Sequence, residues 1–147
     1  NDAPSTITRL QNMGTPDYLI SAACQLVVAQ RLARKNCKDC RVQDDDVNPK
    51  VLKDLGFSEE EASKVKAIKG KGCEKCSDTG YKGRQGIYEI LVVSKPIKEA
   101  ILKQATTPEL REIAIKEGFR TMQDMGRRMI ASGELNFREY ERVLSSE

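Results

Sequence analysis

The chain has 147 residues, of which 39% are hydrophobic and 32% are charged, with a formal net charge of +3 and no histidine. This length suits one ordinary domain or two small ones with a modest core, and no apolar run approaches the roughly 20 residues of a membrane span. Without histidine, a nucleophile beside a base or a carboxylate pair in an evident cleft, the sequence contains no complete active site. Neither a secretory signal nor an initiator Met opens the chain, so we expect a cytoplasmic fragment of a longer protein.

Residues 1–35 are expected to open with a short amphipathic helix that ends at Gly14. Thr15 and Pro16 then predict an N-cap followed by proline at the first position of a second helix. The run 25–33 fits either a helix or a strand by its periodicity. Its β-branched centre and short apolar core favour a buried strand.

Two Cys-x-x-Cys pairs flank the middle of the chain, and together they offer four thiolates: Cys37, Cys40, Cys73 and Cys76. Each pair lets two thiolates converge on one ion from a tight knuckle, and two knuckles fill a closed tetrahedral site. No position is left open for water or substrate. We therefore predict a structural zinc site, with metal binding coupled to folding of the segment between the knuckles and no catalytic role.

Two other chemistries are open to these four cysteines. Paired disulfides would suit a secreted chain, but Cys-x-x-Cys disulfides close very small loops and are usually redox-active. An iron site with the same four-thiolate geometry is also chemically possible. The fifth cysteine, Cys24, lies in an apolar stretch, and we interpret it as a buried and inert thiol.

Basic residues cluster around the first knuckle, which makes nucleic-acid binding an alternative to consider. Four thiolates and one divalent cation together contribute −2, so the net charge with zinc bound falls to about +1. Only 5% of the residues are aromatic and none is Trp, so surfaces for base stacking are not evident. We therefore expect no nucleic-acid partner, and we interpret the basic residues as balancing the anionic centre.

Between the knuckles, Asn48 and Ser58 predict the starts of two short helices. The acidic triplets 44–46 and 59–61 are interpreted as a solvated loop and a helix N-terminus, where carboxylates are stabilised. After the second knuckle, the glycine-rich run 77–86 lacks the Gly-Lys-Ser/Thr ending of a phosphate-binding loop. We interpret this run as turns that let backbone amides face the thiolates.

The segment 87–93 gives the clearest strand signal in the chain, bounded by a glycine before it and by Ser-Lys-Pro after it. Residues 95–147 are expected to be helical throughout. The expected helix starts are Thr107, Thr121 and Asn136. A stripe of methionines in the second of these helices is interpreted as packing within a small bundle, with a partner groove as the alternative.

Segments along the whole chain resemble the end of the motor domain in the secretion and pilus-assembly ATPases of the GspE/PilB type. The matching segments are 1–10, 13–14, 29–34, 72–76, 79–84, 86–89 and 118–122, with Asp124 and Gly126. The resemblance implies an α/β (α+β) fragment in four parts. Residues 1–35 would end a RecA-like motor domain, and 36–80 would form a tetracysteine zinc-binding subdomain. Residues 81–94 would return a strand to the motor sheet, and 95–147 would form a C-terminal helical subdomain.

The resemblance also implies a function for the full-length parent, a hexameric motor at the cytoplasmic face of the inner membrane. Such a motor hydrolyses ATP with Mg²⁺ for type IV pilus extension or type II secretion, in contact with membrane-platform proteins. The four cysteines match the family's metal ligands. Arg31 is a candidate for a nucleotide or subunit contact, with a surface salt bridge as the alternative reading, and we assign no catalytic residue.

The present chain has no Walker motif, so we expect it to be inactive alone. Two other readings stay open, namely a stand-alone zinc-knuckle domain that binds nucleic acid or protein, and a structural adaptor without a motor.

Overall fold

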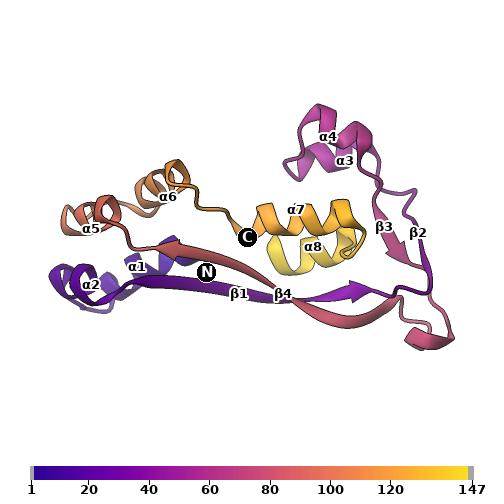
Figure 1. The fold of residues 1–147 in the computed structure, drawn as a ribbon, viewed down its shortest axis with the longest axis horizontal. Helices are drawn as coiled ribbons and strands as arrows, with labels where there is room; N and C mark the ends of the chain where they lie inside the picture. The colour runs from indigo at the N-terminus through magenta and orange to yellow at the C-terminus, as the bar shows by residue number, and fades with distance from the viewer. Residues whose placement is uncertain (1, 146–147) are drawn as a thin grey trace. The chain divides into compact units, whose positions relative to one another are not determined.

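The structure is a computed structural model that describes residues 2–145, and these residues form a mixed α/β fold (Figure 1). The helices are α1 (Ala3–Asn12), α2 (Asp17–Ala23), α3 (Pro49–Asp54), α4 (Glu59–Lys64), α5 (Lys95–Leu102), α6 (Thr107–Lys116), α7 (Met122–Ser132) and α8 (Phe137–Leu144). The strands are β1 (Leu26–Asn36), β2 (Arg41–Gln43), β3 (Ile68–Gly70) and β4 (Tyr81–Val92), and a 3-10 turn, η1, covers Glu74–Cys76. None of the helices in the described residues combines the length and hydropathy that crossing a membrane requires.

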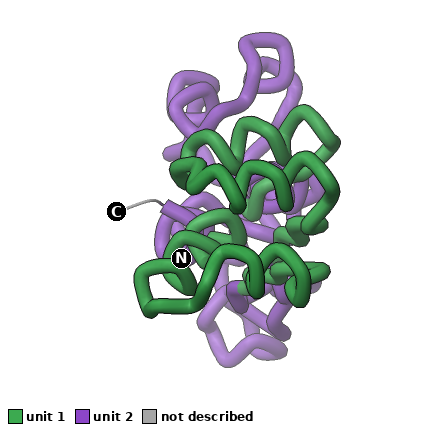
Figure 2. Tube along the Cα trace, turned by 90° about the vertical axis from the view of Figure 1, so that its left-hand side faces the viewer, with its two compact units in different colours: residues 1–30, 88–122 green, residues 31–87, 123–147 purple. Residues whose placement is uncertain are grey.

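The chain divides into two compact units, which Figure 2 shows in different colours. Unit 1 comprises residues 1–30 and 88–122, and unit 2 comprises residues 31–87 and 123–147. Strands β1 and β4 pair with each other in a two-stranded sheet, and β2 pairs with β3 in a second one. The strand predicted for residues 25–33 is thus confirmed as β1, but most of its residues are exposed, so the prediction that the strand is buried is wrong.

Unit 1 has an ordinary apolar core. Helix α1 packs against α6, and α2 packs against α5. Large aliphatic side chains from these helices and from β4 are fully buried together, among them Ile7, Leu91, Ile97, Ile101 and Leu110. Burying each of them stabilises the unit by about 1.5–3 kcal/mol relative to an exposed side chain.

A carboxylate is also buried in unit 1. Glu89 lies on β4 and is only 2% exposed. Its side chain accepts hydrogen bonds from the backbone N–H groups of Ala3 (2.6 Å) and Met122 (2.9 Å), which are the first residues of α1 and α7. Because helix N-termini carry unpaired N–H groups and a positive partial charge, one carboxylate satisfies two helix ends at once.

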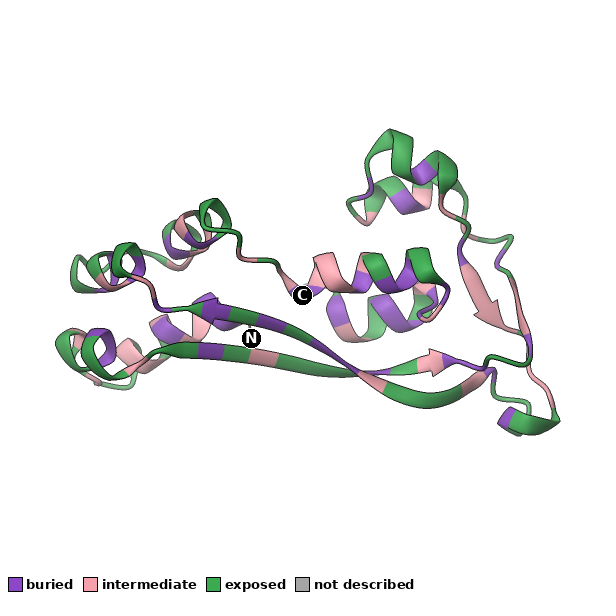
Figure 3. Cartoon of the chain, viewed as in Figure 1, coloured by how far each residue is buried: buried purple, intermediate pink, exposed green. Residues whose placement is uncertain are grey.

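The sheet in unit 1 has one covered face and one bare face. Val27 and Leu91 are buried in the core, whereas the residues that alternate with them are large, apolar and roughly half exposed. Figure 3 shows buried and exposed residues alternating along these strands. The exposed residues are Leu26, Val28, Tyr88, Ile90 and Val92, with exposed fractions from 43% to 58%. An apolar patch of this kind on a sheet face usually marks a surface that another element covers.

Unit 2 contains the insertion between the two knuckles. Strands β2 and β3 pair antiparallel, with Arg41 opposite Gly70 and Gln43 opposite Ile68, so the two ends of the insertion are joined. Helices α3 and α4 pack on each other between these strands. As predicted, Asn48 caps α3 and Ser58 caps α4, the latter with a reciprocal capping box.

Helices α7 and α8 supply the rest of unit 2 and approach each other closely. A Cβ atom at Gly126 would lie 2.8 Å from Cε2 of Tyr140, so only glycine allows this approach. The predicted methionine packing is confirmed at Met129, which is buried on α7. Asn136 caps α8, as expected, by accepting the N–H of Glu139.

Two further sequence predictions in this part of the fold are wrong in detail. The N-cap of α2 is Pro16, not Thr15, because the extended Pro16 places its carbonyl to accept the N–H groups of Leu19 and Ile20. Strand β4 begins at Tyr81, so the end of the run interpreted as turns is strand. Pairing with β1 supplies long-range hydrogen bonds that outweigh the weak strand preference of the glycines.

Candidate metal centre

The four cysteines of the two knuckles come together in unit 2. Cys37 follows the end of β1 and Cys40 directly precedes β2, whereas Cys73 precedes η1 and Cys76 is its last residue. Cys37, Cys40 and Cys76 are buried, and Cys73 is partly buried. Residues 36 positions apart in the sequence are thus brought to one point with little access for water.

The sulfur positions fit a tetrahedral ion. All four Sγ atoms lie within 4.8 Å of one another. The Sγ–Sγ distances are 3.8 Å for Cys37–Cys73, 3.8 Å for Cys40–Cys76 and 3.7 Å for Cys73–Cys76. A zinc ion with bonds of about 2.3 Å to four sulfurs would require edges of about 3.8 Å. The cysteines are free, so the structure does not support the paired-disulfide alternative.

Backbone N–H groups point at one of the sulfurs. Cys76 Sγ accepts hydrogen bonds from the N–H of Cys73 (3.2 Å) and from the N–H of Gly80 (3.2 Å). The second bond confirms that the glycine-rich segment turns a backbone amide toward the thiolates. Such N–H donors stabilise a thiolate, and they orient metal ligands as outer-shell partners do in other metal sites.

The cluster therefore ionises unevenly in the absence of metal. Burial raises the pKa of the Cys40 thiol to about 12, helped by its thiol neighbours. Burial would also raise the pKa of Cys76, but the N–H groups of Cys73 and Gly80 outweigh it and lower the pKa to about 6. Cys76 thus ionises more readily than Cys40, because backbone N–H groups are aimed at its sulfur.

Turn geometry shapes the second knuckle. Ser77 and Asp78 have left-handed φ values of 54° and 61°, which are uncommon for residues with a Cβ atom. The N–H of Asp78 donates to the carbonyl of Cys73 (2.8 Å), which closes the chain around the cysteine pair. This reversal directs the next residues back toward the first knuckle.

A buried amide supports the first knuckle. Asn36, which precedes Cys37, is 1% exposed. Its Nδ2 donates to the carbonyls of Ile68 on β3 (3.1 Å) and Gly133 after α7 (2.9 Å), and its own N–H donates to the carbonyl of Glu134 (2.8 Å). One side chain therefore ties β1, the insertion and the turn between α7 and α8 together. Sequence reasoning missed Asn36, because its partners lie 32 and 97 residues away.

A second polar anchor missed from the sequence is Glu139 on α8. Its fully buried carboxylate accepts from the N–H of Arg34 (2.7 Å), from Nη2 of Arg34 (2.8 Å) and from Nη2 of Arg142 (2.6 Å). Burial alone would raise the pKa of Glu139, but hydrogen bonds from Arg142 and Arg34 lower it to about 2. The guanidinium of Arg34 also lies 4.1 Å from the ring centre of Tyr81 on β4.

Two other residues singled out in the sequence lie away from the metal centre. Arg31 is exposed, and its guanidinium forms no ion pair within residues 2–145, so the salt-bridge reading gains no support. Cys24 is only partly buried, not fully buried as predicted. It packs against the edge of the unit 1 core, because it lies at the exposed end of α2.

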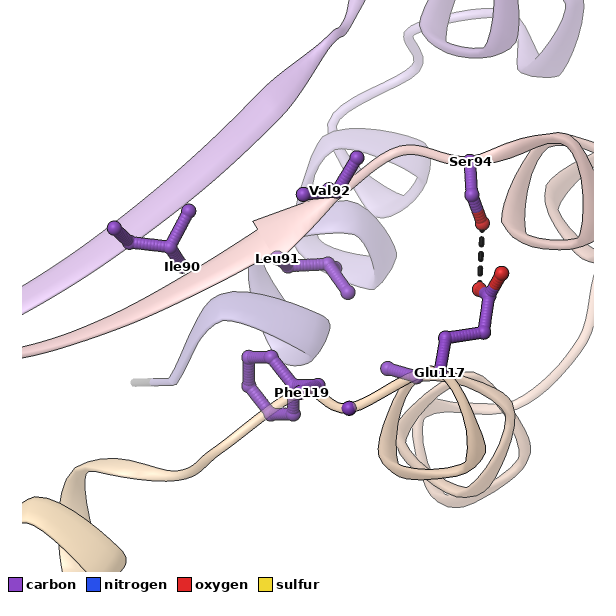
Figure 4. Close-up of a pocket in the computed structure, with 8 residues that line it drawn as sticks. Ile90, Leu91, Val92, Ser94, Glu117 and Phe119 are labelled. Carbon is purple, nitrogen blue, oxygen red and sulfur yellow. Dashed lines mark hydrogen bonds between the residues drawn. The ribbon is translucent and has the colours of Figure 1, made fainter.

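Unit 1 also contains a mostly apolar cavity of about 290 Å³ between β4 and the end of α6. Figure 4 shows Ile90, Leu91 and Phe119 around it, with the Ser94 hydroxyl hydrogen-bonded to the Glu117 carboxylate (2.6 Å). No group at this cavity activates the serine as a nucleophile, since the chain has no histidine and the carboxylate is exposed. The cavity is therefore not a candidate active site.

Comparison with known proteins connects this arrangement to a family. The family described as "Type II/IV secretion system protein" matches residues 1–142. The chain is 44% identical over 126 residues to the type IV pilus assembly ATPase PilB of Thermus thermophilus, covering 86% of this chain and 14% of the relative. It is 36% identical over 143 residues to PilB of Pseudomonas aeruginosa, covering 97% of this chain and 25% of the relative.

A relative from a secretion system matches as well. The type II secretion system ATPase E of Vibrio cholerae is 31% identical over 142 residues, covering 86% of this chain and 27% of the relative. The chain thus spans about a seventh to a quarter of the length of these relatives. The match includes both knuckles, both long strands and all eight helices up to residue 142. The chain belongs to the type II/IV secretion system protein family.

Proposed function

We propose that this chain is the C-terminal region of a motor ATPase for type IV pilus extension or type II secretion, and that its cysteine cluster is a structural zinc module of that motor. The observation that carries the proposal is the closed four-sulfur arrangement, with edges of 3.7–3.8 Å, in a chain whose relatives are assembly ATPases. Four protein thiolates leave no ligand position for water, so the ion would hold structure and carry no reaction.

The residues present fit a metal in three respects. Cys37, Cys40, Cys73 and Cys76 would hold it, and their sulfur spacing suits tetrahedral coordination. The N–H groups aimed at Cys76 favour its thiolate form. Exposed lysines on both knuckles, Lys38 and Lys75, offset the negative charge of a four-thiolate centre. A four-sulfur set also suits iron, so metal analysis must decide between the two ions.

The bare sheet face of unit 1 supports the view that β1 and β4 belong to a larger RecA-like sheet. Five large apolar side chains on one face of a two-stranded sheet would be poorly placed in water. Further strands and helices of a motor domain would cover this face and the free strand edges. In this proposal, β4 returns the chain to the motor sheet after the insertion.

ATP hydrolysis would reside elsewhere in the polypeptide. Residues 1–147 contain no Gly-x-x-x-x-Gly-Lys-Ser/Thr loop to cradle phosphates. We propose that the parent binds ATP and Mg²⁺, assembles as a homohexamer and acts at the cytoplasmic face of the inner membrane with platform proteins. Arg31, exposed on β1, stays a candidate for a nucleotide or subunit contact.

The module's role in such a motor would be to transmit movement. The knuckles lie at the two ends of the insertion, so an ion that binds both would prevent the ends from sliding separately. Asn36 and Glu139 link the same region to α7 and α8. Movement of the motor sheet along β1 would therefore reach the insertion and the C-terminal helices as a rigid displacement.

Two measurements test the proposal. Elemental analysis of the reduced, purified chain should find about one zinc per chain; iron in its place would change the cofactor, and no metal would refute the module. The coding region upstream of residue 1 should encode a Gly-x-x-x-x-Gly-Lys-Ser/Thr loop between a strand and a helix. An initiator codon immediately before Asn1, or ATP turnover by residues 1–147 alone, would overturn the proposed division of labour.

A further inference from the structure

Two glycines in unit 2 cross at a distance that excludes side chains. A Cβ atom built on Gly70 would overlap the carbonyl oxygen of Gly80, and a Cβ atom on Gly80 would overlap the carbonyl oxygen of Gly70. In each case the obstacle is backbone, which cannot move aside as the end of a flexible side chain could. Gly70 ends β3, and Gly80 directly precedes β4. Neither position accepts alanine unless one of the two crossing backbone segments is displaced.

The crossing connects to the first knuckle on both sides. Gly70 lies opposite Arg41 in the β2–β3 ladder, and the next residue, Lys71, donates its N–H to the carbonyl of Cys40 (3.0 Å). The carbonyl of Gly80 accepts the N–H of Cys37 (2.9 Å). The two cysteines of the first knuckle are thus each held by a backbone hydrogen bond from the segments that cross.

The same crossing connects to the second knuckle. The N–H of Gly80 donates to Cys76 Sγ (3.2 Å), and its positive φ of 81° allows its N–H and its carbonyl to serve both knuckles. Gly72, with a φ of 101°, lies against Asp78 directly before Cys73. Hydrogen bonds therefore connect both knuckles to the segments that cross at Gly70 and Gly80.

We propose that Gly70 and Gly80 are positioning residues of the metal centre: their backbone contact sets the separation of the two knuckles, so that the four sulfurs meet at tetrahedral spacing. The inference rests on the proposed metal role of the four cysteines. Neither glycine would touch the ion. Their contribution is to let the two segments approach closely enough for Cys37, Cys40 and Cys76 to meet at tetrahedral spacing when the insertion folds around the ion.

Gly83 offers a matched control. Its φ is +83°, almost equal to that of Gly80, so alanine meets the same backbone strain at either position. The space around Gly83 is open, however, and the nearest atom to an added Cβ is Cδ of Lys35 at 3.9 Å. A difference between Gly80→Ala and Gly83→Ala therefore reports the crossing and not the left-handed conformation.

The experiment compares the unsubstituted chain with Gly70→Ala, Gly80→Ala and Gly83→Ala. Each chain is reduced, stripped of metal and titrated with Co²⁺ and then with Zn²⁺ against a competing chelator. The sulfur-to-cobalt absorption and the ligand-field bands report the number of thiolates and their tetrahedral geometry. We expect Gly70→Ala and Gly80→Ala to bind about 10- to 100-fold more weakly, as outer-shell substitutions typically do, with distorted ligand-field bands. Gly83→Ala should match the unsubstituted chain.

Each outcome has a defined meaning. Equal weakening in all three variants would attribute the effect to strain, and normal binding in Gly70→Ala or Gly80→Ala would show that the contact positions nothing; either overturns the inference. Amide exchange across 97–116 in unit 1 is followed in the same samples. Loss of protection there would show a general folding defect and also overturn the inference. If the unsubstituted chain binds neither ion, the proposed function fails first, which separates the two failures.

Discussion

Unit 1 and the insertion of unit 2 become ordered by different means. Unit 1 buries a continuous set of large aliphatic side chains from four helices and two strands. Within residues 41–72, the buried apolar side chains are two large ones, Leu52 and Phe57, and two alanines, Ala62 and Ala67. Helices α3 and α4 have six residues each, too few to be stable alone. The insertion therefore relies more on its ends, where the thiolates and the paired strands lie, and on a hydrogen bond from Arg127 of α7 to the Leu55 carbonyl (3.1 Å) than on an apolar core.

The largest effect should come from removing half of the metal centre. Replacing Cys73 and Cys76 by serine removes two ligands, and with them a metal-binding free energy that is on the order of 10 kcal/mol in small zinc modules. Hydrogen exchange measured by mass spectrometry should show lost protection over residues 37–80 and retained protection over 97–116. Cys24→Ser, outside the cluster, should change neither region.

Uniform loss of protection along the whole chain in the double variant would contradict this contrast. It would mean that unit 1 also depends on the metal, despite its own core. Retained protection of 37–80 without bound metal would also contradict the contrast between the two regions. The insertion would then be stable without the ion, through its few apolar contacts.

A core substitution in unit 1 should reverse the pattern. Leu110 on α6 is fully buried, so Leu110→Ala should destabilise unit 1 by about 2–5 kcal/mol through the lost burial and the cavity left behind. Zinc affinity should stay as in the unsubstituted chain. Urea unfolding followed by helical circular dichroism measures the first effect, and chelator competition the second. Ile115→Ala, on the same helix but 52% exposed, is the matched control and should cost far less.

The buried carboxylate of Glu139 should have an intermediate effect that depends on pH. Glu139→Gln removes charge-assisted hydrogen bonds with Arg34 and Arg142 and should cost about 1.5–3 kcal/mol near neutral pH. Since the folded pKa of about 2 lies below the ordinary value of 4.5, the native carboxylate stabilises unit 2 fully above about pH 4.5. This stabilisation is lost as pH falls from there toward 2.

The measurement is the difference in urea midpoint between the parent and Glu139→Gln across this pH range. Cysteine protonation affects both chains alike, so it cancels in the difference. The difference in urea midpoint should be largest at neutral pH and should decrease on acidification. Glu141→Gln, an exposed position on the same helix, should show almost no gap. A gap that is independent of pH would show that Glu139 acts by shape alone.

The same contrast explains what the sequence could predict. Helix caps at Asn48, Ser58 and Asn136 were predictable because a cap and its partner are three residues apart. The cysteine pairs were predictable because each knuckle is itself local, and the chemistry of four thiolates requires them to share an ion. Local rules thus gave the starts of α3, α4 and α8 and the four cysteines of the candidate site.

Buried polar anchors could not be predicted in this way. Glu89, Asn36 and Glu139 look like ordinary strand or helix residues until residues 32 to 105 positions away are placed against them. Gly80 lies in a run that local rules describe as a turn, yet its position is set by contact with Gly70 across the insertion. Long-range pairing decided these sites, and one sequence alone does not reveal such pairing.

The smallest predicted effect concerns the cap of α4. Ser58→Ala removes the oxygen that accepts the N–H of Glu61 (3.1 Å), and such a loss costs about 1 kcal/mol. Because α4 has only six residues, this cost should fray the helix locally, so exchange should quicken across 59–64 while zinc affinity stays unchanged. Ser58→Asp keeps a capping oxygen and should restore protection. If Ser58→Ala instead removed exchange protection from β2 and β3, the insertion would unfold as one unit. The strand pairing and the thiolates at its ends would then not keep those ends folded without α4.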